Sequence, residues 1–328
     1  MIITRTPVRI SFFGGGTDYP DYFLDHGGVV LGASIDKYSY ITLKSYHRLS
    51  KFTYRIAYSQ IEELDKLNRI SHPSIKACLK YFGINDPLEI HYIGDWPANT
   101  GLGSSSSFTV GFILALSVLK DWRWSSKILA EKAIHVEQKV IHERVGCQDQ
   151  ILSAYGGFNF IHFNKLGFKV VPLSINSHML KAFRSHILLF YTGIRRVAHK
   201  ILKEQISNTR QGRKDSELFK MKEYCQTAKD LLLQGQFEAF GKLLHQNWKL
   251  KKSLSRQISN SSIDQAYQSA IRCGAWGGKL LGAGGGGFLL VFASPSYHKQ
   301  IIRSLKKMTL VNFDFESLGS RVIYHHPN

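Results

Sequence analysis

The chain has 328 residues, enough for two domains, and its 44% of hydrophobic residues is the usual share for a globular protein with a buried core. The net charge is +19, but the basic residues are spread along the chain without zinc-finger spacing or an aromatic-interleaved RNA-recognition signature, so we expect a basic surface and no nucleic-acid partner. The longest apolar stretch is too short to span a membrane, the four cysteines have no paired spacing, and the first residues lack the apolar segment of a signal peptide, so we expect a cytoplasmic protein with no membrane partner.

The first half of the chain mixes predicted strands and helices. Alternating and β-branched residues predict strands over residues 2–13, 29–35, 38–46 and 89–93, and a hairpin over residues 158–163 and 168–172. The spacing of apolar residues predicts helices over residues 72–81 and 125–145. Glycines at residues 14–16 end the first strand, and those at residues 27–28 form a turn.

The second half of the chain is mostly helical. After a buried strand over residues 187–191, we expect helices over residues 198–207, 217–234, 237–254 and 262–273. A glycine-rich segment at residues 277–287, a strand over 288–292, a helix near 296–308 and a strand near 320–324 follow. Because these elements have no regular βαβ rhythm, we expect the α+β class, with domains at residues 1–180 and 181–328.

Two glycines and four serines at residues 101–107 directly precede an apolar run that begins at Phe108. Glycine lets the backbone approach a ligand closely, and the first turn of a helix has N–H groups without partners at the positive end of the dipole. The junction therefore predicts a phosphate-binding loop and a protein that handles a nucleotide. The alternative is an ordinary glycine–serine linker, and the spacing does not match a Walker A loop.

The second glycine-rich segment, Gly-Ala-Gly-Gly-Gly-Gly at residues 282–287, matches the letters of a dinucleotide-binding motif. That motif requires a strand before it and a helix after it, whereas a strand follows here. Two interpretations stay open: a tight loop packed for steric reasons, and a loop that lies near substrate or phosphates.

Four segments, in the same order along the chain, resemble sugar kinases of the GHMP superfamily. Residues 7–19, which contain Pro-Val-Arg and Gly-Gly-Gly-Thr-Asp-Tyr, resemble the N-terminal motif, and residues 101–107 resemble the phosphate loop. Residues 146–150, Gly-Cys-Gln-Asp-Gln, resemble the segment with the catalytic aspartate, and residues 279–287 resemble the third motif. The Gly-Gly-Gly-Thr-Asp-Tyr form looks most like D-glycero-D-manno-heptose 7-phosphate kinases, and residues 191–196 also resemble them. Galactokinases have Glu-His where this chain has Gly15-Gly16, which argues against free galactose as the substrate.

The resemblance implies a fold and an activity. The fold would combine an N-terminal domain like the second domain of ribosomal protein S5 with a ferredoxin-like C-terminal domain, and residues 97–107 would form the phosphate loop. With ATP and Mg²⁺, the protein would phosphorylate the anomeric hydroxyl of D-glycero-D-manno-heptose 7-phosphate, as a monomer or homodimer, for nucleotide-activated heptose synthesis. The alternatives are an L-fucokinase or galactokinase-like sugar 1-kinase, and a non-catalytic binding protein with the same fold.

The resemblance also implies roles for individual residues. Asp149 would accept the proton of the anomeric hydroxyl or orient that hydroxyl as a fixed charge, and Arg9 would keep this carboxylate ionised. Ser105 and Glu137 would bind magnesium, with Glu143 as a weaker substitute. The residues expected to bind ATP are Gly101, Leu102, Gly103, Ser104, Ser105, Ser106 and Ser107. The residues expected to bind the sugar phosphate are Gly15, Gly16, Thr17, Asp18, Arg196, Gly284 and Gly285.

Each of these roles has a structural alternative. The serines would also cap a helix, which is compatible with phosphate binding. Glu137 would lie on a solvated helix face, Asp18 would form an Asx turn, and Arg196 would be an ordinary surface residue.

Overall fold

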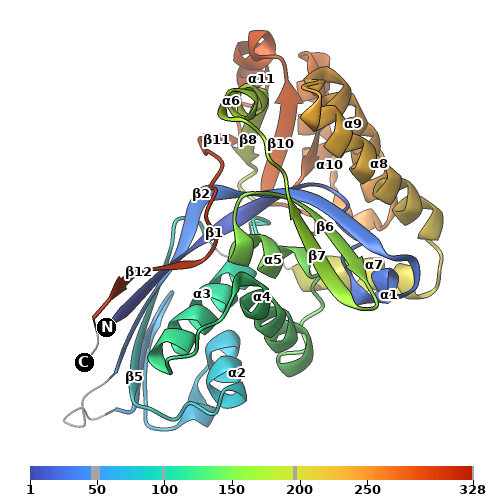
Figure 1. Ribbon diagram of the computed structural model, residues 1–328. Coiled ribbons are helices and arrows are strands. Elements are labelled where there is room, and N and C mark those ends of the chain that lie inside the picture. Colours follow the sequence, from blue (N-terminus) through green and yellow to red (C-terminus); the bar gives the residue numbers. More distant parts are fainter. Residues whose placement is uncertain (46–51, 98–99, 195–197, 327–328) are drawn as a thin grey trace.

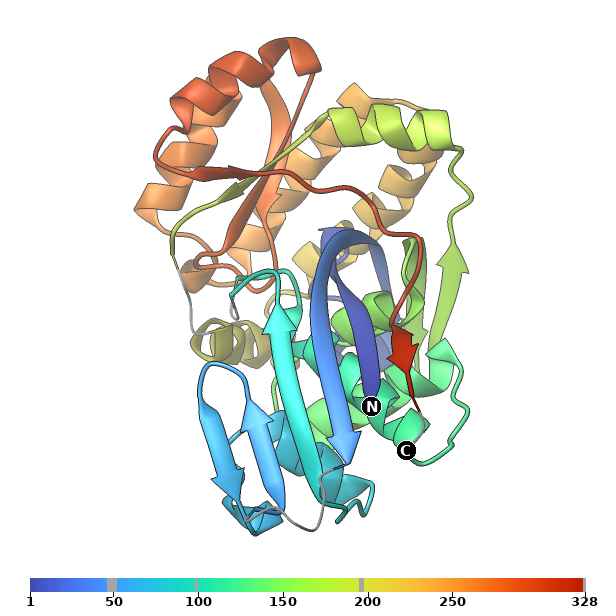
Figure 2. The same ribbon diagram turned by 90° about the vertical axis from the view of Figure 1, so that its left-hand side faces the viewer.

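The computed structural model describes residues 1–45, 52–97, 100–194 and 198–326 (Figure 1). The chain forms two β-sheets with helices packed against them, and the second sheet lies above the first in both views (Figures 1 and 2). Among the helices in these ranges, all are too short or too polar to cross a membrane. In the described ranges, helices pack against two sheets that are antiparallel except for one pair of strands, which confirms the predicted α+β class.

The first sheet has eight strands in the order β12-β1-β2-β5-β3-β4, and β6 and β7 extend it beside β2. All of its pairs are antiparallel except β3 with β5. Its strands are β1 (Ile2–Phe13), β2 (Gly28–Ser45), β3 (Tyr54–Ala57), β4 (Ile61–Leu64), β5 (Leu88–Gly94), β6 (Phe158–Asn164), β7 (Gly167–Pro172) and β12 (Arg321–His325).

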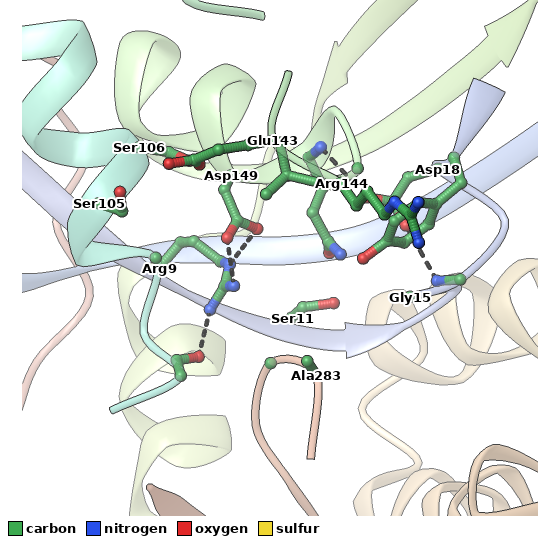
Figure 3. A pocket seen from close by; sticks show the side chains of 18 of the residues that line it. Arg9, Ser11, Gly15, Asp18, Ser105, Ser106, Glu143, Arg144, Asp149 and Ala283 are labelled. Carbon is green, nitrogen blue, oxygen red and sulfur yellow. Dashed lines mark hydrogen bonds and ion pairs between the residues drawn. The ribbon is translucent and has the colours of Figure 1, made fainter. Parts of the chain in front are cut away.

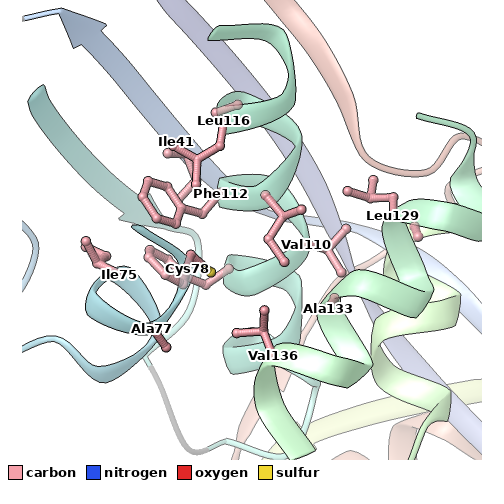
Figure 4. Packing of buried hydrophobic residues seen from close by; sticks show 14 of the residues in the cluster. Ile41, Ile75, Ala77, Cys78, Val110, Phe112, Leu116, Leu129, Ala133 and Val136 are labelled. Atoms are coloured by element: carbon pink, nitrogen blue, oxygen red, sulfur yellow. The ribbon is translucent and has the colours of Figure 1, made fainter. Parts of the chain in front are cut away.

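Helices α2 (Pro73–Tyr81), α3 (Ser104–Leu119), α4 (Ser126–His135) and α5 (Gln148–Tyr155) lie together below the first sheet in Figure 1. Helix α3 is central, because it contacts β1, β2, α2, α4 and α5 and is buried over most of its length. Figure 4 shows its apolar side chains between the neighbouring elements: Val110, Phe112 and Leu116 with Ile41, Cys78, Leu129, Ala133 and Val136. This packing fixes the N-terminus of α3 relative to β1.

The second sheet is antiparallel, in the order β11-β8-β10-β9. Its strands are β8 (Ile187–Tyr191), β9 (Ala275–Leu280), β10 (Phe288–Ala293) and β11 (Thr309–Val311). The helices of this half are α6 (Ser177–Ser185), α7 (Ala198–Arg210), α8 (Asp215–Leu233), α9 (Phe237–Ser253), α10 (Ser261–Arg272) and α11 (His298–Ser304). Short elements complete the chain: α1 (Pro20–His26) and the 3₁₀ turns η1 (Leu67–Arg69), η3 (Arg256–Ile258) and η4 (Pro295–Tyr297).

A cluster of phenylalanines joins the two halves. Phe12 at the end of β1 stacks on Phe158 of β6, with ring centroids 5.4 Å apart. Its ring also meets Phe183 of α6 at 5.5 Å and Phe240 of α9 at 5.9 Å, both edge to face. These buried contacts hold the end of β1, and the glycine-rich segment after it, against the second half of the chain.

Several sequence-based expectations about the elements are wrong. The segments expected as separate strands over residues 29–35 and 38–46 belong to one strand, β2, as far as its end at Ser45, since its pairing with β1 continues past Asp36 with a register shift between Pro7 and Val8. The expected helix over residues 125–145 ends as α4 at His135 and continues only as a π-helical turn, η2 (Val136–Val140). Residues 275–280 form the strand β9, so the glycine-rich segment expected at residues 277–287 begins inside a strand.

The division of the chain near residue 180 stays a prediction. Strand β12, from the end of the predicted C-terminal domain, pairs with β1 in the first sheet. Its pairing joins Ile2 with His325, and the Met1 amino group donates to the carbonyl oxygen of His326 at 2.6 Å. The two ends of the described chain therefore lie side by side, as Figure 2 also shows.

Candidate active site

A pocket of about 330 Å³ lies between the two halves of the chain. The end of β1, the glycine-rich segment after it, the N-terminus of α3 and residues 143–149 line it from the first half. Lys251 of α9, Lys279 of β9, Gly282 and Ala283 line it from the second half. Figure 3 shows the Arg9–Asp149 pair between Ser105 and Ser106 on one side and Gly15 and Asp18 on the other.

Arg9 and Asp149 form a bidentate ion pair in this pocket. Arg9 Nε donates to Asp149 Oδ1 at 2.7 Å and Nη2 donates to Oδ2 at 2.6 Å, while Nη1 donates to the Gly101 carbonyl oxygen at 2.7 Å. The Arg9 side chain is 3% exposed and that of Asp149 is 25% exposed, so the carboxylate remains open to the pocket. Planar, charge-assisted contacts of this kind fix the carboxylate in one orientation.

The phosphate-loop segment places a helix N-terminus at the pocket. Gly103 has φ +78°, and a Cβ there would lie 3.2 Å from Asp149 Oδ2 and 3.4 Å from Arg9 atoms, so glycine permits the close approach. Ser104, Ser105 and Ser106 begin α3 and line the pocket. Backbone N–H groups in such a first turn suit an anionic ligand.

Two of the phosphate-loop residues expected to bind ATP do not line the pocket. Ser107 is buried, and its hydroxyl pairs with Ser39 Oγ at 2.6 Å, away from the pocket. Leu102 packs in the apolar core, and its carbonyl oxygen accepts from the Arg9 backbone N–H at 3.0 Å. Ala98 and Asn99 of the predicted 97–107 loop lie outside the described residues.

Glu137 is a buried acid next to the serine helix. It lies in the π-helical turn and is 1% exposed, so the alternative of a solvated helix face is wrong. Ser106 Oγ donates to Glu137 Oε2 at 2.9 Å and Gln150 Nε2 donates to the same oxygen. Burial, assisted by the charge of Glu143, raises the pKa of Glu137 to about 8.

The donor set around Glu137 fits a hard cation. Its other oxygen, Oε1, is buried without a hydrogen-bond partner among the described residues. Ser105, which directly precedes Ser106 in α3 and is exposed, lines the neighbouring pocket. Magnesium in proteins commonly takes one or two carboxylates, waters and substrate phosphates, which is compatible with this arrangement.

Asp18 is held at the other side of Asp149. It is fully buried, accepts from the Gly16 N–H at 2.9 Å and the Gln148 N–H at 3.3 Å, and lines the pocket. Burial raises its pKa, and these backbone hydrogen bonds oppose the shift. At Gly146 a Cβ would lie 2.0 Å from Asp18 Oδ2, so the chain can approach this carboxylate only with glycine there.

The other residues expected at the sugar end divide into two groups. Gly15 and Gly16 line the pocket, whereas Thr17 is buried and its hydroxyl donates to the carbonyl oxygens of Gly14 and Val29, both at 2.8 Å. Thr17 therefore shapes the turn that carries Asp18.

The second glycine-rich segment, at residues 282–287, reaches the pocket two residues earlier than expected. Gly282 and Ala283 line it, while Gly284 and Gly285 pack against Ile258, whose carbonyl oxygen accepts from the Gly285 N–H at 2.8 Å. Arg196, expected to hold the phosphate of the sugar, lies outside the described residues.

Two buried lysines, which the sequence reasoning missed, complete the pocket. Lys251 Nζ donates to the Gly15 carbonyl oxygen at 3.3 Å and to Gln205 Oε1 at 3.1 Å. Lys279 Nζ donates to the carbonyl oxygens of Ser11 at 2.8 Å and Phe12 at 3.1 Å. Burial, with the charges of Lys251 and Arg9, lowers the pKa of Lys279 to about 7. The position of Lys279 at the start of the third motif was an available signal, whereas Lys251 lies in a helix with several lysines.

Two family descriptions match the chain. One for the N-terminal domain of GHMP kinases matches residues 69–157, and one for their C-terminal domain matches residues 228–309. Together they cover more than half of the chain, and each lies in a different half.

Individual proteins are similar over nearly the full chain. A D-glycero-alpha-D-manno-heptose 7-phosphate kinase of Campylobacter jejuni is 29% identical over 317 residues, which is 93% of each chain. An L-fucokinase/L-fucose-1-P guanylyltransferase of Bacteroides fragilis is 26% identical over 92% of this chain and 35% of its own length. The crystal structure of a D-glycero-D-manno-heptose 1-phosphate kinase from Bacteroides thetaiotaomicron superimposes with a TM-score of 0.82 over 100% of both chains, at 22% identity. These matches confirm the predicted two-domain fold.

Proposed function

The chain belongs to the GHMP kinase family, and we propose that it transfers the γ-phosphoryl group of ATP to the anomeric hydroxyl of D-glycero-D-manno-heptose 7-phosphate. The products would be the 1,7-bisphosphate and ADP, for nucleotide-activated heptose synthesis. The observation that carries this proposal is one pocket that combines the Arg9–Asp149 pair with the N-terminus of a serine-rich helix.

The geometry suggests how the residues act. The serine helix holds the ATP phosphates through backbone N–H groups of its first turn, with Ser104 and Ser106 close by. Asp149, fixed by Arg9, accepts a hydrogen bond from the anomeric hydroxyl and aims its oxygen at the γ-phosphorus. The new bond joins the anomeric oxygen to phosphorus, and the bond between phosphorus and the β,γ-bridging oxygen of ATP breaks. The hydroxyl proton leaves to the Asp149 carboxylate, and ADP leaves with the bond's electron pair.

Magnesium would be held by Ser105 and Glu137. When bound, it would neutralise charge on the ATP phosphates. Glu137 must lose its proton to act as a ligand, and Ser106 and Gln150 keep its carboxyl group in place. We expect Glu137→Gln to raise the Mg²⁺ concentration needed for half-maximal turnover about tenfold or more. Glu143→Gln is the matched comparison, and a larger effect there would move the metal role to Glu143.

Support for a heptose phosphate as the acceptor comes from the N-terminal motif and from the relative in Campylobacter jejuni. The relative in Bacteroides fragilis, whose name includes L-fucokinase, keeps a free sugar as the second candidate. Both candidates use the same phosphoryl donor and the same Asp149 chemistry, so they differ only in the acceptor.

The test is ADP release from ATP and Mg²⁺ with heptose 7-phosphate, L-fucose, galactose and mannose, at micromolar to millimolar concentrations. Saturable turnover with the heptose phosphate, and a KM at least tenfold lower than for the free sugars, is the expected result. Turnover with only a free sugar would replace the substrate and retain the kinase chemistry. Silence with every sugar, together with salt-sensitive binding of DNA or RNA, would favour a non-catalytic binding protein.

A further inference from the structure

We propose that Lys251 selects a phosphorylated acceptor, by binding the anionic group that the sugar carries at the end opposite its reacting hydroxyl. The proposal rests on the proposed function and names a specificity-determining residue for it. Lys251 belongs to α9, in the second half of the chain, and outside the four motifs.

Lys251 lies at the acceptor end of the pocket. Figure 3 shows Ser105 and Ser106 on one side of Asp149, and Gly15 and Asp18 on the other. Because its ammonium group contacts the Gly15 carbonyl oxygen at 3.3 Å, Lys251 is placed on the Gly15 side. A sugar whose anomeric hydroxyl meets Asp149 would extend from the serine helix toward this lysine.

The lysine is a built part of the pocket and is 6% exposed. The hydrogen bonds to Gly15 and to Gln205 Oε1, at 3.1 Å, fix its amino group at the pocket wall. Gln205 is itself 2% exposed, so the amide that holds the ammonium group is also buried. A cation fixed in this way loses little side-chain entropy when it binds an anion.

The charges around Lys251 favour an anionic ligand. Four cationic and three acidic side chains line the pocket among the described residues: Arg9, Arg144, Lys251 and Lys279, with Asp18, Glu143 and Asp149. Asp149 is already bound by Arg9 through both oxygens. Burial lowers the pKa of Lys279, and the charges of Lys251 and Arg9 add to this shift while the Asp18 carboxylate opposes it, so the cations at the pocket repel one another. A phosphate dianion between Lys251 and Lys279 would relieve this repulsion.

The experiment compares Lys251→Met and Lys251→Arg with wild type in full steady-state kinetics. We expect Lys251→Met to raise KM for heptose 7-phosphate about 10- to 100-fold, the effect of losing a charged hydrogen bond. KM for ATP and kcat should stay within about threefold of wild type, and Lys251→Arg should recover much of the lost affinity. Lys249→Met is the matched control, because Lys249 is exposed on the same helix, and its kinetics should equal those of wild type.

A second variant tests the charge without removing the lysine. Gln205→Glu would place a carboxylate against the Lys251 ammonium group, and we expect it also to raise KM for the sugar phosphate with KM for ATP unchanged. This variant decides the question if Lys251→Met does not fold.

The outcomes separate the two levels of the proposal. If wild type turns over no phosphorylated sugar, the proposed substrate class is wrong. Suppose that wild type turns over heptose 7-phosphate and that Lys251→Met leaves KM for this sugar unchanged. Then only the role of Lys251 is wrong. If Lys251→Met does not fold, an unchanged KM in Gln205→Glu leads to the same conclusion. If KM for heptose 7-phosphate and KM for ATP rise equally and kcat falls by a similar factor, Lys251 is a structural residue. That result would also overturn the inference.

Discussion

We expect Asp149→Asn to remove most turnover while the fold and ATP binding persist. Asparagine has nearly the shape of aspartate but keeps only one acceptor oxygen, and its amide N–H groups would face an Arg9 donor. Of the two hydrogen bonds that Arg9 makes to Asp149, one would therefore be lost. The third Arg9 bond, to the Gly101 carbonyl oxygen, would remain.

The structure sets the size of both effects. A lost hydrogen bond to a charged group costs about 1.5–3 kcal/mol of stability. Because the Asp149 side chain is 25% exposed and water reaches it, the lower end of that range applies. Loss of a positioned proton acceptor typically lowers a rate by about 100- to 10,000-fold. The catalytic loss should therefore greatly exceed the loss of stability.

The assay measures kcat by ADP release, ATP affinity by calorimetry and the melting temperature of each variant. Asp86→Asn is the control, because it alters the surface pair of Asp86 with Lys120, whose side chains are 45% and 33% exposed. This control should retain wild-type kcat and lose at most about 1 kcal/mol. A kcat for Asp149→Asn within tenfold of wild type would refute the role of this residue in proton transfer. A parallel loss of ATP binding and melting temperature would show that the residue is structural.

Three further outcomes are expected. Ser107→Ala should destabilise the protein by about 1–2 kcal/mol without changing kcat or KM for ATP, because its buried hydroxyl pairs with Ser39. An increased KM for ATP, measured beside the melting temperature, would contradict this. Gly146→Ala should displace Asp18, which a Cβ would approach to 2.0 Å, and lower kcat/KM for the acceptor about 100-fold; wild-type kinetics would show that the carboxylate can move without loss. For Lys279, whose pKa burial lowers from 10.5 to about 7, the folded state binds fewer protons than the unfolded chain between these values. Its contribution to stability therefore rises with pH across this window, is complete above about pH 10.5 and is lost as pH falls through 7. Lys279→Met should flatten the rise, and parallel melting curves of the variant and wild type from pH 7 to 9 would contradict the shift.

Local patterns predicted most strands and helices, and failed where tertiary contacts override them. The glycine-rich segment was expected at residues 277–287, yet its first two glycines, at residues 277 and 278, lie in strand β9. A Cβ at Gly277 would lie 2.1 Å from the Gly241 carbonyl oxygen of α9, so the glycine allows a helix to approach the strand. Short elements, such as β3 (Tyr54–Ala57) and β4 (Ile61–Leu64), were missed because four residues carry little periodicity.

In the candidate site, too, local motifs predicted some residues and tertiary contacts determined the others. Motif resemblance located Arg9 and Asp149, which the structure brings together, because both lie in contiguous segments with recognisable glycines. The burial of Glu137 depends on a π-helical turn, which shifts the helix register and leaves no periodic signature. Lys251 is one of several lysines in α9, and only the packing of that helix shows which of them faces the pocket.

The pairing of β12 with β1 also constrains the order of folding during synthesis. Strand β1 is translated before β12, and residues 321–325, which cover its outer edge from Ile2 to Arg5, leave the ribosome more than 300 residues later. Until then this edge presents unpaired backbone groups, and such edges can recruit strands of other chains. The first sheet is therefore complete only after the second half has been made, and until then its open edge is a site of the kind at which nascent chains aggregate.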